Sequence, residues 1–150
     1  MADGTTQSEE MISASSFQRL IDIGIALSAE RDTNVLMETI LLEAKSLSNA
    51  DGGTLYIRTP DNRLKFEIMR TDSLNIAMGG TTGKDINFPP LNLFDPETGE
   101  ENHKNVASAA VLTGDSINIP DAYENESFDF SGTKKFDEGT GYRSKSFLCV

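Results

Sequence analysis

The chain has 150 residues, of which 37% are apolar and 25% charged, and 13 Lys and Arg stand against 24 Asp and Glu, giving a formal net charge of -11. This length suits one domain with a single core, and the composition is polar without being that of a disordered chain. The negative charge repels phosphate groups, so we expect no nucleic-acid partner and no direct contact with a membrane.

The chain carries few signs of transport, metal binding or disulfide formation. No apolar run approaches the roughly 20 residues that cross a bilayer, and residues 1–4 lack the pattern of a signal peptide, which predicts a cytoplasmic protein. Cys149 is the single cysteine and is expected to be a small buried apolar residue. His103 lies in a polar loop without a second His or Cys, so no metal site and no cofactor are predicted.

The first third of the chain predicts two helices in tandem. Residues 1–10 are small and polar and are expected to be a flexible lead-in. From Met11 to Ala29, apolar residues recur at helical spacing and form a broad apolar face. Asp32 or Thr33 can cap a second helix that continues to Asn49. The broad face of the first helix fits either burial against the protein's own sheet or contact with a second copy.

Strand signals follow the two helices. Residues 54–58 and 64–70 contain β-branched and aromatic residues and flank a turn at residues 59–62, which predicts a β-hairpin with alternating faces. Residues 71–104 contain glycine and proline breaks. They are expected to be extended segments separated by turns, with a short strand near Asp85 to Phe88.

The last third predicts a short helix, a strand, a helix with a loop, and a final strand. Asn105 can cap the short helix, which Gly114 ends. A strand is expected at residues 116–119, a short helix plus loop at residues 121–136, and another strand from residue 144 toward 150.

This order of elements, together with the motifs of the last third, resembles a GAF domain, the small-molecule sensor module of phosphodiesterases, cyclases and histidine kinases. The motifs are Val106-Ala107 with Leu112-Thr113-Gly114, then Asn118-Ile119-Pro120-Asp121-Ala122-Tyr123, then Asp137 with Thr140-Gly141-Tyr142-Arg143-Ser144. The resemblance implies an α+β, PAS-related fold in which an antiparallel six-stranded sheet carries helices on one face and a ligand pocket on the other. We expect such a domain over residues 11–150, without the strand and helix that complete the family's fold.

The resemblance also implies a function. The long segment between residues 79 and 106 is similar to a bacterial branch of the family that is often attached to HD-type phosphohydrolases, adenylate cyclases or histidine kinases. The implied role is a regulatory sensor domain of a bacterial signalling protein, with a cyclic nucleotide as candidate ligand and an attached output enzyme as its target. A ligand-free dimerisation or scaffolding module is the alternative. A homodimer through the N-terminal helix is expected in either case.

The resemblance assigns five ligand-binding residues. Val106 and Ala107 would offer backbone N–H groups at a helix start to a phosphate. Asp137 would face the base, and the hydroxyls of Thr140 and Ser144 would close over the ligand. Structural alternatives are a core position for Val106, a brace of its loop for Asp137 and a turn for Thr140.

The remaining candidates are aromatic or catalytic. The aromatic residues of the last third could form a pocket wall or fill a core, and they are Tyr123, Phe128, Phe130 and Phe136. Tyr142 is assigned to packing. The glycine-rich run at residues 79–84 lacks the Ser or Thr that follows lysine in a phosphate-binding loop, and no nucleophile or zinc motif is present. The isolated chain is therefore not expected to be an enzyme.

Overall fold

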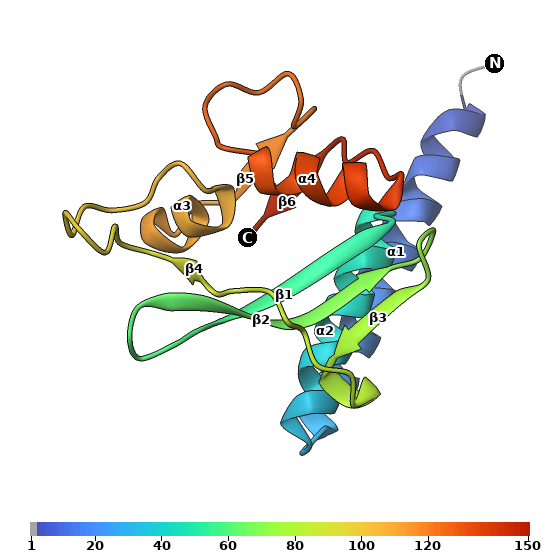
Figure 1. Ribbon diagram of the computed structural model, residues 1–150. Helices are drawn as coiled ribbons and strands as arrows, with labels where there is room; N and C mark the ends of the chain where they lie inside the picture. The colour runs from blue at the N-terminus through green and yellow to red at the C-terminus, as the bar shows by residue number, and fades with distance from the viewer. Residues whose placement is uncertain (1–2) are drawn as a thin grey trace.

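The computed structural model describes residues 3–150, with side chains described from Ala14 onward (Figure 1). Its elements are α1 (Asp3–Ala29), α2 (Thr33–Ser48), β1 (Gly52–Arg58), β2 (Arg63–Thr71), β3 (Ile76–Gly79), the 3-10 helix η1 (Gly80–Thr82), β4 (Leu91–Asn92), α3 (Val106–Thr113), β5 (Ile117–Ile119), α4 (Ser131–Thr140) and β6 (Phe147–Cys149). The mixture of helices and antiparallel strands confirms the α+β class.

The six strands form two sheets, which differs from the single six-stranded sheet that the resemblance implies. β1 pairs with one edge of β2, and β3 and β4 share the other edge. β5 and β6 form a separate antiparallel pair. Among the described strands, β1 and β6 each pair along one edge only, so no backbone ladder joins the two sheets. Figure 1 shows β5, β6, α3 and α4 gathered away from the turn that joins α1 to α2.

Helices α1 and α2 lie on one side of the four-stranded sheet, with α2 between α1 and the strands (Figure 1). Gly53 on β1 allows this close approach, because a Cβ there would lie 2.9 Å from Cδ1 of Leu41 and 3.0 Å from Cγ of Lys45. Leu41 and Lys45 are the buried residues of α2. The buried helix residues next to β1 at this point thus come from α2.

The predicted second helix is confirmed, and its ends follow local signals. The Asp32 carboxylate accepts hydrogen bonds from the backbone N–H groups of Asn34 and Val35, at 2.8 and 3.2 Å. Asn49 ends the helix in the left-handed conformation at φ 52°. The first helix begins earlier than Met11, since α1 includes residues 3–10 of the expected lead-in, while residues 1–2 lie outside the described part.

Two ion pairs attach α2 to the sheet. Arg70 on β2 is only 6% exposed and pairs with Glu38 of α2, and its guanidinium also donates to the carbonyls of Met69 and Met78 at 2.8 and 2.7 Å. Full pairing makes this burial tolerable, because an isolated buried charge would be very costly. The backbone N–H of Thr81 donates to Glu38 at 2.9 Å, which holds η1 against α2. Lys45 makes the second pair with an aspartate just after β2.

A β-bulge changes which residues of β2 share a face. Leu55 pairs with Ile68, whereas the next residue, Tyr56, pairs with Phe66, so Glu67 is an extra residue in β2. Successive residues of β1 point to opposite faces, and Ile68 and Phe66 therefore also face opposite sides. Ile68 lies toward α2 and Phe66 lies toward the other face. The alternation predicted along this strand is wrong at that point, because it assumed an uninterrupted ladder.

The segment after β3 also differs from the expectation. No strand forms near Asp85 to Phe88, and the edge of β2 that does not pair with β1 is occupied by β3 and the short β4 instead. Phe88 packs its ring against Phe66 with the ring centroids 5.5 Å apart. Side-chain contact thus holds this proline-containing segment across the sheet face, without a backbone ladder.

Candidate functional site

Asp137 is the centre of the region where the sequence predicts a ligand site. It lies on α4, is 2% exposed, and accepts hydrogen bonds from the Tyr123 hydroxyl at 2.9 Å, the Ser144 backbone N–H at 2.7 Å and the Ser144 hydroxyl at 2.8 Å. The structure therefore brings two of the five predicted residues, Asp137 and Ser144, into direct contact. These bonds are made within the chain, which is the geometry of a brace that ties α4 to the loop before β6.

The same brace includes Arg143 and Asp121, to which the sequence assigned no role in binding, and Tyr123, a candidate for the pocket wall. Arg143 makes a two-pronged ion pair with Asp121, at 2.9 and 3.0 Å, and places its guanidinium 3.7 Å from the ring centre of Tyr123. The hydrogen bond to Asp137 raises the pKa of Tyr123. Tyr123 thus joins three segments of the chain: the turn that follows β5, helix α4, and the loop before β6. The Asp121-Ala122-Tyr123 motif was visible in the sequence, but its partners Asp137 and Arg143 lie 14 and 22 residues further along the chain.

Thr140 does not join this cluster. It is exposed at the end of α4, and its hydroxyl donates to the Phe136 carbonyl one turn back, at 2.8 Å. This bond occupies the donor within the helix itself. The next residue, Gly141, ends α4 in the left-handed conformation, as the turn alternative proposed.

Val106 and Ala107 begin α3, as predicted. The Asn105 side chain caps this helix by accepting from the backbone N–H groups of Ala107 at 3.0 Å and Ser108 at 3.1 Å. The Ala107 N–H, which was assigned to a phosphate, is therefore bonded to the cap. Val106 packs against the small core formed by Ile119 and its neighbours.

The aromatic residues of the last third mainly fill this core. Phe130 is 5% exposed, and its ring centroid lies 5.4 Å from that of Phe147 and 6.5 Å from that of Phe128. Tyr123 instead lies at the surface, 37% exposed. The structure thus places two of the four predicted wall residues in a core.

Tyr142 connects the last loop to the four-stranded sheet. Its hydroxyl donates to the Asp51 carboxylate at 2.7 Å, and Asp51 also accepts from the backbone N–H and hydroxyl of Ser73. Desolvation first, and then the bond to Asp51, raise the pKa of Tyr142 to about 12. Tyr142 therefore makes a specific polar contact between segments 91 residues apart, in addition to its packing.

The sheet face opposite α2 carries an aromatic cluster that the sequence did not identify. Tyr56 and Phe66 have ring centroids 4.7 Å apart, and Phe66 contacts Phe88, which is 43% exposed. Burial raises the pKa of Tyr56 to about 12, and the nearby Cys149 adds to this shift. The sequence pattern does not predict this cluster, because the bulge at Glu67 places Phe66 on the same sheet face as Tyr56.

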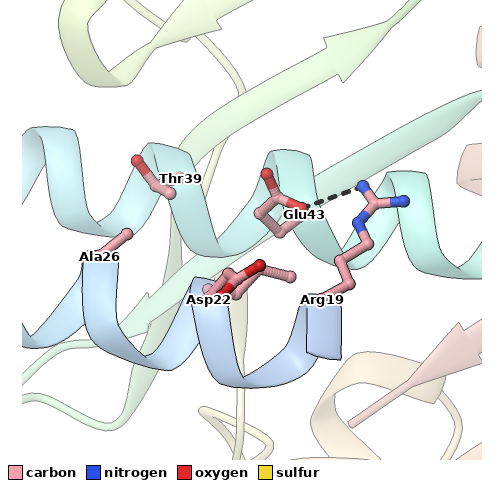
Figure 2. Close-up of a pocket in the computed structure, with 6 residues that line it drawn as sticks. Arg19, Asp22, Ala26, Thr39 and Glu43 are labelled. Carbon is pink, nitrogen blue, oxygen red and sulfur yellow. Dashed lines mark hydrogen bonds and ion pairs between the residues drawn. The ribbon is translucent and has the colours of Figure 1, made fainter. Parts of the chain in front are cut away.

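Two surface hollows lie elsewhere. One, of about 280 Å³, lies between α1 and α2, and Figure 2 shows its lining residues, with Arg19 of α1 reaching Glu43 of α2 at 3.1 Å. The other, of about 450 Å³, lies between the β1–β2 turn and the loop after β4, and includes Arg63 and Phe94. Neither hollow is lined by any of the five predicted ligand residues.

Within the described residues, no group of three or more His, Cys, Asp or Glu side chains is placed to hold a metal ion. Over the same part of the chain, no helix has both the length and the apolar character that crossing a membrane requires.

Comparison with known proteins shows distant similarity. No protein-family model matches the chain. The chain is 28% identical, over 127 residues, to a cGMP-specific 3',5'-cyclic phosphodiesterase of Drosophila mojavensis; the match includes 81% of this chain and 10% of the phosphodiesterase. The chain thus spans about a tenth of the length of that relative. The similarity supports a distant link to cyclic-nucleotide signalling proteins.

Proposed function

We propose that the chain is a regulatory sensor domain of the GAF type, which binds a small cytoplasmic ligand and controls an attached output enzyme in a signal-transduction protein. The first candidate ligand is a cyclic nucleotide. The observation that carries this proposal is the similarity to a cGMP-specific phosphodiesterase over 81% of the chain. The motifs from Val106 to Ser144 support the GAF type, and the long segment between residues 79 and 106 favours the bacterial branch. The chain itself is proposed to be non-catalytic.

The sheet face that carries Tyr56, Phe66 and Phe88 suits a nucleotide base, because aromatic rings offer a flat apolar surface for stacking. Ser144 and Asp137 would contact the same ligand only after exchanging their mutual hydrogen bonds for bonds to it. Ligand would then favour a second arrangement of α4 and the last loop. It could bias the output only by the difference in its affinity for the two arrangements.

The rival function is a ligand-free dimerisation or scaffolding module. Two observations favour it: the Asp137 carboxylate accepts three hydrogen bonds from its own chain, and the Ala107 N–H is capped by Asn105. In this module the predicted ligand residues would serve only to fold the last third of the chain.

Thermal unfolding with cyclic AMP, cyclic GMP and cyclic dinucleotides separates the two functions. A ligand at about 100 times its Kd stabilises the folded state by about 2.7 kcal/mol, which raises Tm by roughly 5–10 °C for a domain of this size. We expect such a rise for at least one of these ligands and a smaller rise for Ser144→Ala. Thr140→Val is the matched control, because it removes a hydroxyl that is bonded within α4 and lies outside the contact of Asp137 with Ser144, and it should leave the rise unchanged. No rise with any of them at millimolar concentration would reject the cyclic-nucleotide sensor and leave the scaffold.

A further inference from the structure

Residues 106–150 form a unit of their own, here called the C-terminal unit. It contains α3, β5, α4 and β6, and its core is built around Ile119, Ala122 and Phe130, with partly buried apolar neighbours that all come from the same unit. Among the described strands, neither β5 nor β6 forms a ladder with the four-stranded sheet. The position of the unit against that sheet therefore depends on side-chain contacts, polar ones among them.

One polar contact is buried and lies at the start of α3. The Ser108 hydroxyl donates to the Asn92 carbonyl of β4 at 3.1 Å, and Ser108 is fully buried. The next two residues of α3, Ala109 and Ala110, are buried as well. The Asn102 side chain donates to the same carbonyl at 2.9 Å. Because a buried donor without a partner costs free energy, this end of the unit should stay attached to the sheet.

Another polar contact joins Tyr142, on the loop before β6, to Asp51, just before β1. The Tyr142 hydroxyl donates to the Asp51 carboxylate at 2.7 Å, and both residues are half-buried. Asp51 is also held independently, because its carboxylate accepts from the backbone N–H and the hydroxyl of Ser73 at 3.0 and 2.6 Å. If Tyr142 leaves, Asp51 keeps its place and water can replace the lost hydroxyl.

The two contacts lie at opposite ends of β1. Asn92 of β4 pairs with Arg63, next to the turn between β1 and β2, whereas Asp51 precedes the first residue of β1. The seven residues of β1 span about 20 Å at roughly 3.3 Å per residue. A rotation of about 10° at the buried contact would therefore move Tyr142 by about 3.5 Å, which is enough to break its hydrogen bond.

We propose that the bond between Tyr142 and Asp51 is a releasable latch, and that the C-terminal unit swings about the buried contact of Ser108 with Asn92 when this latch opens. Hinge motions turn about a few fixed residues and separate the parts at the far end. The two contacts suit these roles, since loss of the buried one leaves an unpaired group and loss of the latch exchanges a partner for water. Removal of the latch bond should raise the open population about tenfold, the lower end for a bond to a charged acceptor.

The latch and the brace around Asp137 share one short loop. Tyr142 and Ser144 are two residues apart on it, and Ser144 donates to Asp137 through both its N–H and its hydroxyl. A ligand that takes over these bonds would move the loop and pull Tyr142 from Asp51, and this step alone rests on the proposed function. The change would then reach α2, because Asp51 lies two residues after Asn49, which ends that helix.

Distances between pairs of spin labels test the latch in the 150-residue chain, after Cys149→Ser removes the natural thiol. The first pair, Leu47→Cys with Glu138→Cys, lies at exposed positions of α2 and α4. Leu47 is four residues before Asp51, and Glu138 is four residues before Tyr142, so this pair reports on the latch.

A second pair of labels reports on the pivot. Lys65→Cys and Val111→Cys lie at exposed positions of β2 and α3, and Val111 is three residues after Ser108. In Tyr142→Phe we expect the first pair to show a longer distance in about ten times as many molecules as in the wild type, and the second pair to keep its distance. A general loosening of the fold would instead lengthen both distances.

Tyr123→Phe is the matched control, because it removes a hydroxyl that is bonded to Asp137 inside the C-terminal unit. It should leave both distances unchanged. The inference is overturned if the first pair keeps its wild-type distance in Tyr142→Phe, if Tyr123→Phe lengthens that distance equally, or if the pivot pair lengthens as much as the first pair.

Addition of cyclic GMP keeps this inference separate from the proposed function. If the nucleotide raises Tm while Tyr142→Phe leaves the first distance unchanged, the sensor stands and the latch is rejected. If Tyr142→Phe lengthens the first distance while no cyclic nucleotide raises Tm, the latch stands and the cyclic-nucleotide sensor is rejected.

Discussion

Replacement of Asp137 by alanine tests whether the buried brace stabilises the fold. The carboxylate is 2% exposed and accepts three hydrogen bonds, from Tyr123 and from the backbone and side chain of Ser144. Each bond to a charged acceptor contributes about 1.5–3 kcal/mol. Some of the released donors can turn to water, because Ser144 is only half-buried. We therefore expect a loss of about 3–5 kcal/mol in the free energy of unfolding.

This loss corresponds to a fall in Tm of roughly 10 °C for a domain of this size, measured by circular dichroism. Ser144→Ala removes the hydroxyl bond and keeps the backbone bond, so it should cost only about 1.5 kcal/mol, the lower end of that range. Glu138→Ala changes an exposed neighbouring carboxylate and should leave Tm unchanged. If Asp137→Ala melts within about 2 °C of the wild type, the hydrogen bonds around Asp137 do not stabilise the fold as reasoned here.

Two further predictions concern α2 and the turn after β3. Burial alone would raise the pKa of Glu38, but hydrogen bonds from Thr81 and Arg70 outweigh it and lower the pKa from 4.5 to about 2. The stabilisation by Glu38 is thus present above pH 4.5 and lost as pH falls toward 2, and Glu38→Gln should flatten the dependence of Tm on pH in that window; an unchanged slope would contradict it. Gly79 has φ +71°, and an added Cβ would lie 1.9 Å from the Glu67 carbonyl oxygen, whereas Gly83 has φ +68° with nothing within 4 Å. Urea unfolding should show a much larger loss for Gly79→Ala than the roughly 1 kcal/mol expected for Gly83→Ala; equal losses would show that the close contact at Gly79 is relieved at no cost.

Much of the local structure could be predicted from the sequence, because the signals lie within a few residues of the elements they control. The side chains of Asp32 and Asn105 cap α2 and α3 by accepting from the backbone N–H groups two and three residues ahead, and Gly114 ends α3 in a left-handed turn. The hairpin of β1 and β2 followed from β-branched residues on both sides of a turn. The resemblance assigned both Asp137 and Ser144 to ligand binding, and the structure places them in direct contact with each other.

The sequence by itself determined helix caps, hairpin and charge, since each depends on neighbours along the chain or on composition alone. The tertiary structure decided which faces meet. The bulge at Glu67 turns Phe66 away from α2. The Asp137 carboxylate, which the sequence assigned to a ligand, instead accepts a hydrogen bond from Tyr123. Helix α1 contacts α2 on one side and leaves apolar side chains exposed on the other. These outcomes depend on contacts between distant segments, where a shift of one residue in a strand or a quarter turn of a helix changes every partner.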